Sequence, residues 1–167
     1  MKDTKKIVLL AVLTSLAIVL SLIDKVVTPM VFPFLPTAKI GFANVIVVLV
    51  LYTYNFKETL TLVTIKILIA NLLFGGITSF IIGGSASITS FLSMYAIYIV
   101  FKDKVSAIGI SAVGGFVHVM VQLFVSKFYY GINDAIMYYG SLLIVVSLVS
   151  GVIIGFIGNK LITYLKI

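Results

Sequence analysis

The feature that most constrains this chain is a series of apolar runs of about 15–22 residues, the length that crosses a hydrocarbon core about 30 Å thick as a helix. Hydrophobic residues make up 62% of the chain and charged residues 10%. A soluble domain needs about 25% charged residues to cover its surface with groups that water can solvate. The sequence therefore predicts an all-α, polytopic membrane protein with one integral membrane domain, residues 1–167.

Six transmembrane helices fit the pattern of apolar runs. Between the first two we expect a loop over residues 24–39, because this segment contains all three prolines, Pro29, Pro33 and Pro36. Residues 75–84 are too short to cross and carry a glycine pair at each end, which favours a re-entrant or surface turn. The aromatic segment 127–139 is expected to be a loop. The expected spans are about 6–23, 40–54, 58–74, 85–101, 105–126 and 140–162.

The lysines predict the orientation of these spans. With the N-terminus inside the cell, eight lysines lie in cytoplasmic segments and three in outer segments, which fits the positive-inside rule. The basic N-terminal stretch before the first apolar run resembles a signal peptide, but no clear cleavage site follows it, so we expect a retained first helix. Both termini are then cytoplasmic and the protein is a multi-pass protein of the cell membrane. The inner lysines are Lys2, Lys5, Lys6, Lys57, Lys102, Lys104, Lys160 and Lys166, and the outer ones are Lys25, Lys39 and Lys127.

The fifth span carries a polar stripe along one side. Gly114, His118, Gln122 and Ser126 recur every four residues, and successive steps of four drift by only about 40° around a helix. Polar groups inside a bilayer need partners, so the stripe should face other helices or a cavity. His118 and Gln122 could contact a ligand. Hydrogen bonds to each other or to a neighbouring helix would explain them equally well.

The predicted orientation brings polar groups from four spans to one depth, in the outer half of the membrane, where a pocket open to the outside is the simplest use for them. A serine in a span more often bonds a backbone carbonyl or allows close helix packing. Lys66 is a stronger candidate, because a charge near the middle of a span costs about 2.5–3.5 kcal/mol on insertion scales. It can also pair within the bundle. The candidate ligand-binding residues are Lys39, Asn44, Lys66, Asn71, Ser87, His118 and Gln122, and positive charges among them suit an anionic ligand.

Small residues spaced by four predict where helices pack closely. On the sixth span they are Ser147, Gly151 and Gly155, and on the fifth they are Ala107, Ser111 and Gly115. Ala11 and Ser15 form a similar pair on the first span.

Enzymatic and nucleic-acid functions find little support in the sequence. The five acidic residues are scattered near span ends, so no carboxylate pair forms for acid–base chemistry or for holding Mg²⁺. His118 is the one histidine and the chain has no cysteine, so we expect no metal site and no cofactor. The net charge of +7 comes without a basic run, which argues against nucleic-acid binding.

Three stretches resemble a known family. TAKIGFANVIVVLVLYTYNFKETL is similar to the K-x-G-x-A-N signature of heptaprenyl diphosphate synthase component I proteins, also called Gx transporters. ISAVGGFVHVMVQLFVS resembles their G-G-x-x-H-x-x-x-Q helix, and GGITSFIIGGSASITSFLSMYAIY resembles their Gly- and Ser-rich stretch. The resemblance extends to the S components of energy-coupling factor (ECF) transporters, which are six-helix substrate-binding membrane subunits.

The resemblance implies that the chain captures a small micronutrient, or an isoprenoid or quinone precursor, from outside the cell. Its partners would be a coupling membrane subunit and two ATPase subunits, and the protein itself would not be an enzyme. The family pattern assigns ligand contacts to Lys39, Gly41, Asn44, His118 and Gln122. An A-x-x-x-A pattern that docks the coupling subunit corresponds to Ala11 and Ser15, with serine in place of the second alanine.

Two other functions remain open. The chain can be a membrane accessory component of a heptaprenyl diphosphate synthase, although it lacks the aspartate-rich motif that binds a prenyl diphosphate through Mg²⁺. It can also be a small proton-coupled carrier that uses Lys66 and His118. In the transport hypothesis, the proline-bearing segment with Pro29, Pro33 and Pro36 gates the ligand site.

Overall fold

The computed structural model describes residues 2–31, 40–131 and 135–165, and in these ranges the chain is helical with short connections. The all-α class is confirmed, and so is the number of six α-helices within the described ranges. In chain order the elements are α1 (Lys2–Val31), α2 (Ala43–Thr53), α3 (Phe56–Phe74), α4 (Gly76–Phe101), the 3-10 helix η1 (Lys102–Lys104), α5 (Ala107–Tyr130) and α6 (Ala135–Leu165).

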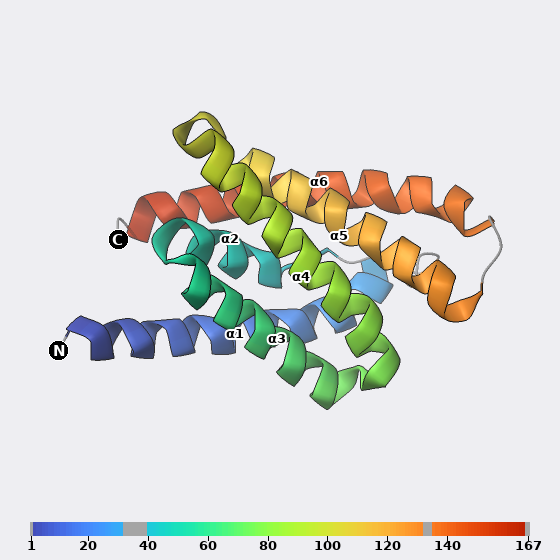
Figure 1. The fold of residues 1–167 in the computed structure, drawn as a ribbon, viewed down its shortest axis with the longest axis horizontal. Helices are drawn as coiled ribbons and strands as arrows, with labels where there is room; N and C mark the ends of the chain where they lie inside the picture. Colours follow the sequence, from blue (N-terminus) through green and yellow to red (C-terminus); the bar gives the residue numbers. More distant parts are fainter. Residues whose placement is uncertain (1, 32–39, 132–134, 166–167) are drawn as a thin grey trace.

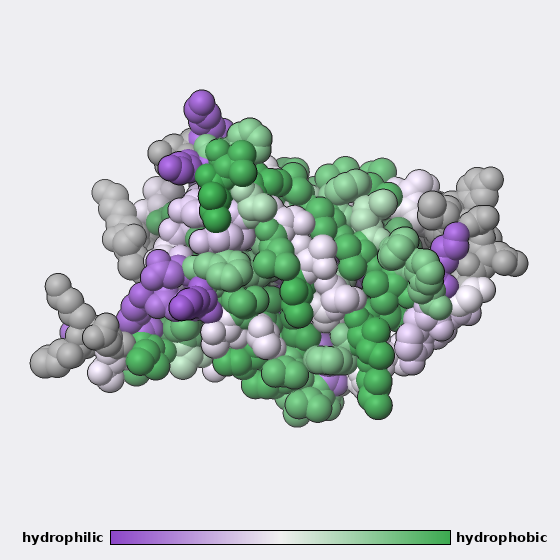
Figure 2. All heavy atoms as spheres, in the orientation of Figure 1, coloured by the Kyte–Doolittle hydropathy of each residue, from purple (hydrophilic) through white to green (hydrophobic). Residues whose placement is uncertain are grey.

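The helices lie roughly along one long axis, with both chain termini at the same end (Figure 1). The α2–α3 turn and η1 lie at that end too, so the exposed lysines Lys5, Lys6, Lys57, Lys102 and Lys104 gather there. Figure 2 shows hydrophobic side chains over the middle of the visible face, with the most hydrophilic ones near the two ends. An apolar band between polar ends is the surface expected of a protein embedded in a bilayer.

Four helices, α1, α4, α5 and α6, are long and apolar enough to cross a membrane. The other two helices, α2 and α3, do not meet this criterion, and the reason differs between them. α3 has 19 residues but carries Lys57, Glu58 and Lys66. α2 has 11 residues, which rise about 16 Å as a helix and therefore reach only about halfway across a hydrocarbon core.

α2 forms the centre of the bundle. Its side chains are buried without a break from Val45 to Leu51. A helix that is hydrophobic on every side is stable only when other elements surround it. Here α1, α3, α5 and α6 all contact it.

The predicted loop after the first span was wrong at its beginning, because α1 continues to Val31 and includes Pro29. Pro29 lies in the last turn, so its missing N–H removes one intrahelical hydrogen bond, the one to the Lys25 carbonyl oxygen, only two residues before α1 ends. Asp24 does not end the helix either, because its carboxylate accepts a hydrogen bond from the Thr28 hydroxyl one turn later (2.9 Å). Pro33 and Pro36 lie outside the described residues.

The predicted turn over residues 75–84 was wrong beyond its first glycine pair. The chain turns at Gly75 and Gly76, where Gly76 has a φ of +65° and begins α4, but the second pair, Gly83 and Gly84, is buried within that helix. A Cβ on Gly84 would lie 3.2 Å from Cγ2 of Ile67 on α3. Gly84 therefore allows α3 and α4 to approach closely, a role that sequence reasoning confused with chain reversal.

The aromatic loop is shorter than predicted. α5 extends through Tyr130 and ends at Gly131, whose φ of +62° is the left-handed conformation that commonly terminates helices. α6 starts at Ala135 rather than at Gly140.

The small residues that predict packing faces on the fifth and sixth spans lie against each other in the structure. A Cβ on Gly115 would lie 2.7 Å from the Ser147 carbonyl oxygen, and a Cβ on Gly151 would lie 2.9 Å from the Ser111 carbonyl oxygen. Gly155 meets the Ala107 carbonyl oxygen in the same way, at 2.9 Å. Only hydrogen fits at these three positions, so the backbones of α5 and α6 are in direct contact.

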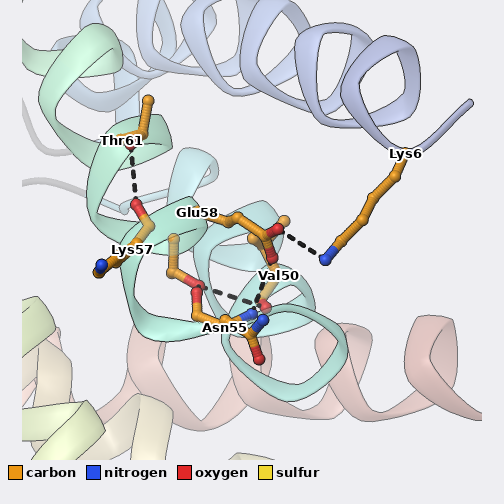
Figure 3. A network of polar contacts seen from close by, with 7 residues as sticks. Lys6, Val50, Asn55, Lys57, Glu58 and Thr61 are labelled. Carbon is orange, nitrogen blue, oxygen red and sulfur yellow. Dashed lines mark hydrogen bonds and ion pairs between the residues drawn. The ribbon is translucent and has the colours of Figure 1, made fainter. Parts of the chain in front are cut away.

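A polar network fixes the α2–α3 turn against α1 at the lysine-rich end (Figure 3). Lys6 forms an ion pair with Glu58 (2.6 Å), and the other Glu58 oxygen accepts the backbone N–H of Asn55 (3.0 Å). Asn55 and Glu58 together make a capping box that starts α3.

Candidate functional site

A cavity of about 210 Å³ lies inside the bundle, and residues from all six helices line it. They come from the C-terminal halves of α1 and α3, the N-terminal halves of α2 and α4, the stretch of α5 from its second turn to its middle, and the middle of α6. The cavity therefore extends from the middle of the bundle toward the end that lies away from the termini. Five of the seven predicted ligand residues line it, namely Asn44, Lys66, Asn71, Ser87 and His118.

The polar stripe of α5 faces the interior as predicted. Gly114, Gln122 and Ser126 are buried, and His118 lines the cavity. Gln122 is not among the lining residues, so its predicted contact with a ligand has no geometric support in this arrangement. The stripe joins α5 to its neighbours as well, because the Ser90 hydroxyl of α4 donates to the Gly114 carbonyl oxygen (2.7 Å).

Lys66 and Asn44 meet at the cavity wall. Lys66 is only 7% exposed although it carries an ammonium group. Its Nζ donates to Oδ1 of Asn44 (3.5 Å), which joins α3 to the first turn of α2. A buried lysine in a membrane helix is costly, so its retention beside a cavity marks a functional candidate.

Asn71 lines the cavity but is also used within the protein. Its Nδ2 donates to the Ile67 carbonyl oxygen (2.7 Å), and its Oδ1 accepts from the Ser79 hydroxyl of α4 (3.0 Å). These bonds hold the end of α3 against the start of α4. Asn71 therefore stabilises the α3–α4 junction, and less of its hydrogen-bonding capacity remains for a ligand.

Two serines of α4 take the structural role that is common for serine in a span. Ser85 donates to the Ile81 carbonyl oxygen (2.6 Å) and Ser93 to the Thr89 carbonyl oxygen (2.9 Å), each within one turn. Ser87 instead lines the cavity.

Asp24 closes one side of the cavity by holding the chain that enters α2. The Gly41 N–H points at both carboxylate oxygens (3.0 and 3.1 Å), and the Thr28 hydroxyl donates to one of them. The Ile40 N–H donates in turn to the Thr28 hydroxyl oxygen (3.4 Å). Asp24 and Thr28 are 8% and 3% exposed, so these bonds form away from water. We refer to Asp24, Thr28, Ile40 and Gly41 as the entry clamp.

Gly41 has a conformation that few other residues could adopt. Its φ is +84°, and a Cβ there would lie 3.2 Å from Nδ2 of Asn44. The Gly41 carbonyl oxygen accepts the Asn44 N–H (2.8 Å) and so starts α2. The glycine of the K-x-G-x-A-N signature therefore determines where Asn44 lies at the cavity wall.

Sequence reasoning missed the contribution of α1 to the cavity. Ser21, Asp24, Lys25 and Thr28 all line it, at spacings of three and four that define one face of a helix. This pattern resembles the α5 stripe and could have revealed them. It was overlooked because residues 24–39 were read as a loop.

Other predicted residues lie elsewhere. Lys39, Pro33 and Pro36 lie outside the described residues. Pro29 lines the cavity from the last turn of α1. Ala11 and Ser15 are on the exposed side of α1, opposite the buried Leu13, Thr14 and Ala17. Within residues 2–31, 40–131 and 135–165, no three His, Asp or Glu side chains cluster as they would around a metal ion.

The fold and the site together define a helical membrane protein with a cavity in its bundle that is lined by both polar and apolar groups. The family model for heptaprenyl diphosphate synthase component I matches residues 13–161, so the chain belongs to this family. No curated protein and no solved structure gives a significant match.

Proposed function

We propose that the protein binds a small polar or anionic molecule in the cavity and acts as the substrate-binding subunit of an ECF-type transporter. The observation that carries this proposal is the cavity itself, because it gathers a buried lysine, a histidine and amide groups from separate membrane helices. Polar side chains that converge on a cavity inside an apolar bundle are a typical small-molecule site. With the orientation expected from the lysines, the cavity lies toward the outer face.

In this proposal the ligand enters past the entry clamp, and its uptake is driven by other subunits. A coupling membrane subunit would dock on α1 at Ala11 and Ser15, whose exposure leaves a close approach possible. Two ATPase subunits would supply the energy.

The second candidate is a membrane accessory component of a heptaprenyl diphosphate synthase, and the name of the family favours it. The chain would then present an apolar surface to the growing prenyl chain while a partner carries out catalysis. The charged and amide groups of the cavity fit a seven-isoprene chain poorly, so an apolar groove would have to lie elsewhere on the bundle. The family name thus supports the second candidate, and the cavity supports the first.

Copurification separates the two candidates. The tagged protein, extracted in a mild detergent, should bring down ATPase subunits and a coupling membrane protein if it is a transport subunit. Recovery of a soluble, aspartate-rich synthase instead would overturn this proposal in favour of the second candidate. Uptake that collapses with the proton gradient and needs no ATPase would favour the proton-coupled carrier.

Native mass spectrometry tests the cavity directly. A small molecule retained by the wild-type protein should be lost or depleted in His118→Ala, with the protein still inserted and monodisperse. Lys57→Ala is a suitable control, because Lys57 is exposed at the lysine-rich end. Equal retention by both variants would count against the cavity as the binding site.

A further inference from the structure

The cavity is lined by two lysines that come from different helices. Lys25 lies on α1 and Lys66 on α3, and both are among the lining residues. We propose that Lys25 and Lys66 together bind the anionic group of the ligand, which makes the ligand a small molecule with a compact anionic head such as a phosphate, a diphosphate or a carboxylate. This inference rests on the proposed small-molecule binding function and specifies its ligand class.

The lysine and carboxylate side chains of the lining are Lys25, Lys66 and Asp24, which give two positive formal charges and one negative one. The negative charge is that of Asp24, and its carboxylate is directed at the Gly41 N–H and the Thr28 hydroxyl in the entry clamp. Hydrogen bonds from the backbone spread this charge into the protein. The balance therefore favours an incoming anion over a cation.

Both ammonium groups make long hydrogen bonds to neutral oxygens. Lys25 Nζ donates to the Ala70 carbonyl oxygen at 3.4 Å, and Lys66 Nζ donates to Asn44 Oδ1 at 3.5 Å. Ala70 is on α3, one turn beyond Lys66. The ammonium group of Lys25 therefore lies near the part of the cavity wall that carries Lys66. An anionic oxygen is a stronger acceptor than either amide oxygen and can recruit both ammonium groups.

The other lining residues determine the polarity and size of the part of the ligand beyond its anionic group. Ile67, Val119 and Ile154 add apolar surface to the lining. The volume of about 210 Å³ equals that of about seven water molecules in the liquid, so the part of the ligand that the cavity itself holds is small.

The absence of cysteine from the chain allows a test that needs no knowledge of the ligand. Ser87→Cys introduces one thiol at the cavity lining, in protein reconstituted into phosphatidylcholine nanodiscs. The probes are an anionic and a cationic methanethiosulfonate, the sulfonatoethyl and trimethylammonioethyl reagents, with each rate divided by its rate toward free mercaptoethanol. The anionic reagent should react about tenfold faster than the cationic one, as expected for nearby charges at intermediate dielectric.

Charge-removing variants assign this preference to particular residues. Lys25→Met and Lys66→Met, each in the Ser87→Cys background, should each reduce the anion-to-cation ratio about three- to tenfold. Lys25→Arg keeps the charge and should retain the ratio. Lys127→Met is the matched control, because Lys127 is near the end of α5 but does not line the cavity, and it should leave the ratio unchanged. Because a lysine variant that fails to fold would elute in the void volume, the Lys25→Arg result keeps the test decisive.

The possible outcomes separate this inference from the proposed function. Equal rates with both reagents, or equal effects of Lys25→Met and Lys127→Met, would overturn the anion site while leaving a binding cavity. No reaction with either reagent would overturn the proposed function itself, because the cavity would then be closed to solutes.

Protection of the Ser87→Cys thiol from labelling shows whether the bound anion is a dissolved molecule or a lipid headgroup. Inorganic diphosphate in the medium should slow the labelling of Ser87→Cys, whereas choline should not, and the reverse result would contradict an anion site. Slower labelling in phosphatidylglycerol nanodiscs than in phosphatidylcholine nanodiscs would assign the anionic group to a lipid headgroup instead of a dissolved molecule.

Discussion

Replacing Asp24 should weaken the entry clamp and loosen the start of α2. In Asp24→Ala the Gly41 N–H loses both acceptor oxygens and the Thr28 hydroxyl loses one. A hydrogen bond to a charged group contributes about 1.5–3 kcal/mol, and a buried donor left without an acceptor costs about 1–3 kcal/mol. Because the Thr28 hydroxyl can turn to another acceptor, we expect Asp24→Ala to lower the free energy of unfolding by about 2–4 kcal/mol.

Two milder variants give a predicted order of effects. Asp24→Asn keeps one oxygen for the Gly41 N–H and should cost about 1–2 kcal/mol, and Thr28→Val removes one donor and should cost about 1 kcal/mol. Thermal unfolding in dodecyl maltoside can be followed by tyrosine fluorescence, because the chain has nine tyrosines and no tryptophan. Hydrogen–deuterium exchange over residues 40–44 reports the local loosening and should accelerate in the same order.

Glu58→Gln is the control, because it removes one negative charge just as the Asp24 variants do. Glu58 pairs with Lys6 at the lysine-rich end, where the pair is partly exposed and should contribute about 0–1 kcal/mol. An Asp24→Ala protein that unfolds at the wild-type temperature, with unchanged exchange over residues 40–44, would refute the entry clamp.

Three further predictions follow from helix contacts. Gly151→Val should prevent close contact between α5 and α6 and destabilise the protein by about 1–3 kcal/mol or more in thermal unfolding, whereas Gly109→Val, which meets only side chains, should cost less. Ser90→Ala should cost about 1 kcal/mol in the same assay, because the Gly114 carbonyl oxygen loses its buried donor; no loss would mean that this bond contributes nothing. Ser15→Leu should leave stability unchanged but abolish copurification of a coupling subunit, and intact recovery would argue against docking at this position.

Local patterns in the sequence were enough to determine the class of the protein and several of its contacts. The apolar runs predicted helices that pack in a membrane, and the four-residue spacing of Gly114, His118 and Gln122 predicted a stripe that faces inward. The small residues of α5 and α6 predicted that each helix packs closely against a neighbour, but not that the neighbour of each is the other. These features succeed because helical periodicity is a local property, which the order of residues expresses directly.

Tertiary structure decided the features that depend on distant partners. The pair Gly83 and Gly84 carries the same local signal whether it reverses the chain or lies within a helix where Gly84 packs against Ile67, and only the position of α3 distinguishes the two roles. Asp24 and Gly41 are 17 residues apart, with residues outside the described ranges between them, so no periodicity links them. The cavity depends on such contacts, because the relative placement of six helices determines which polar stripes meet.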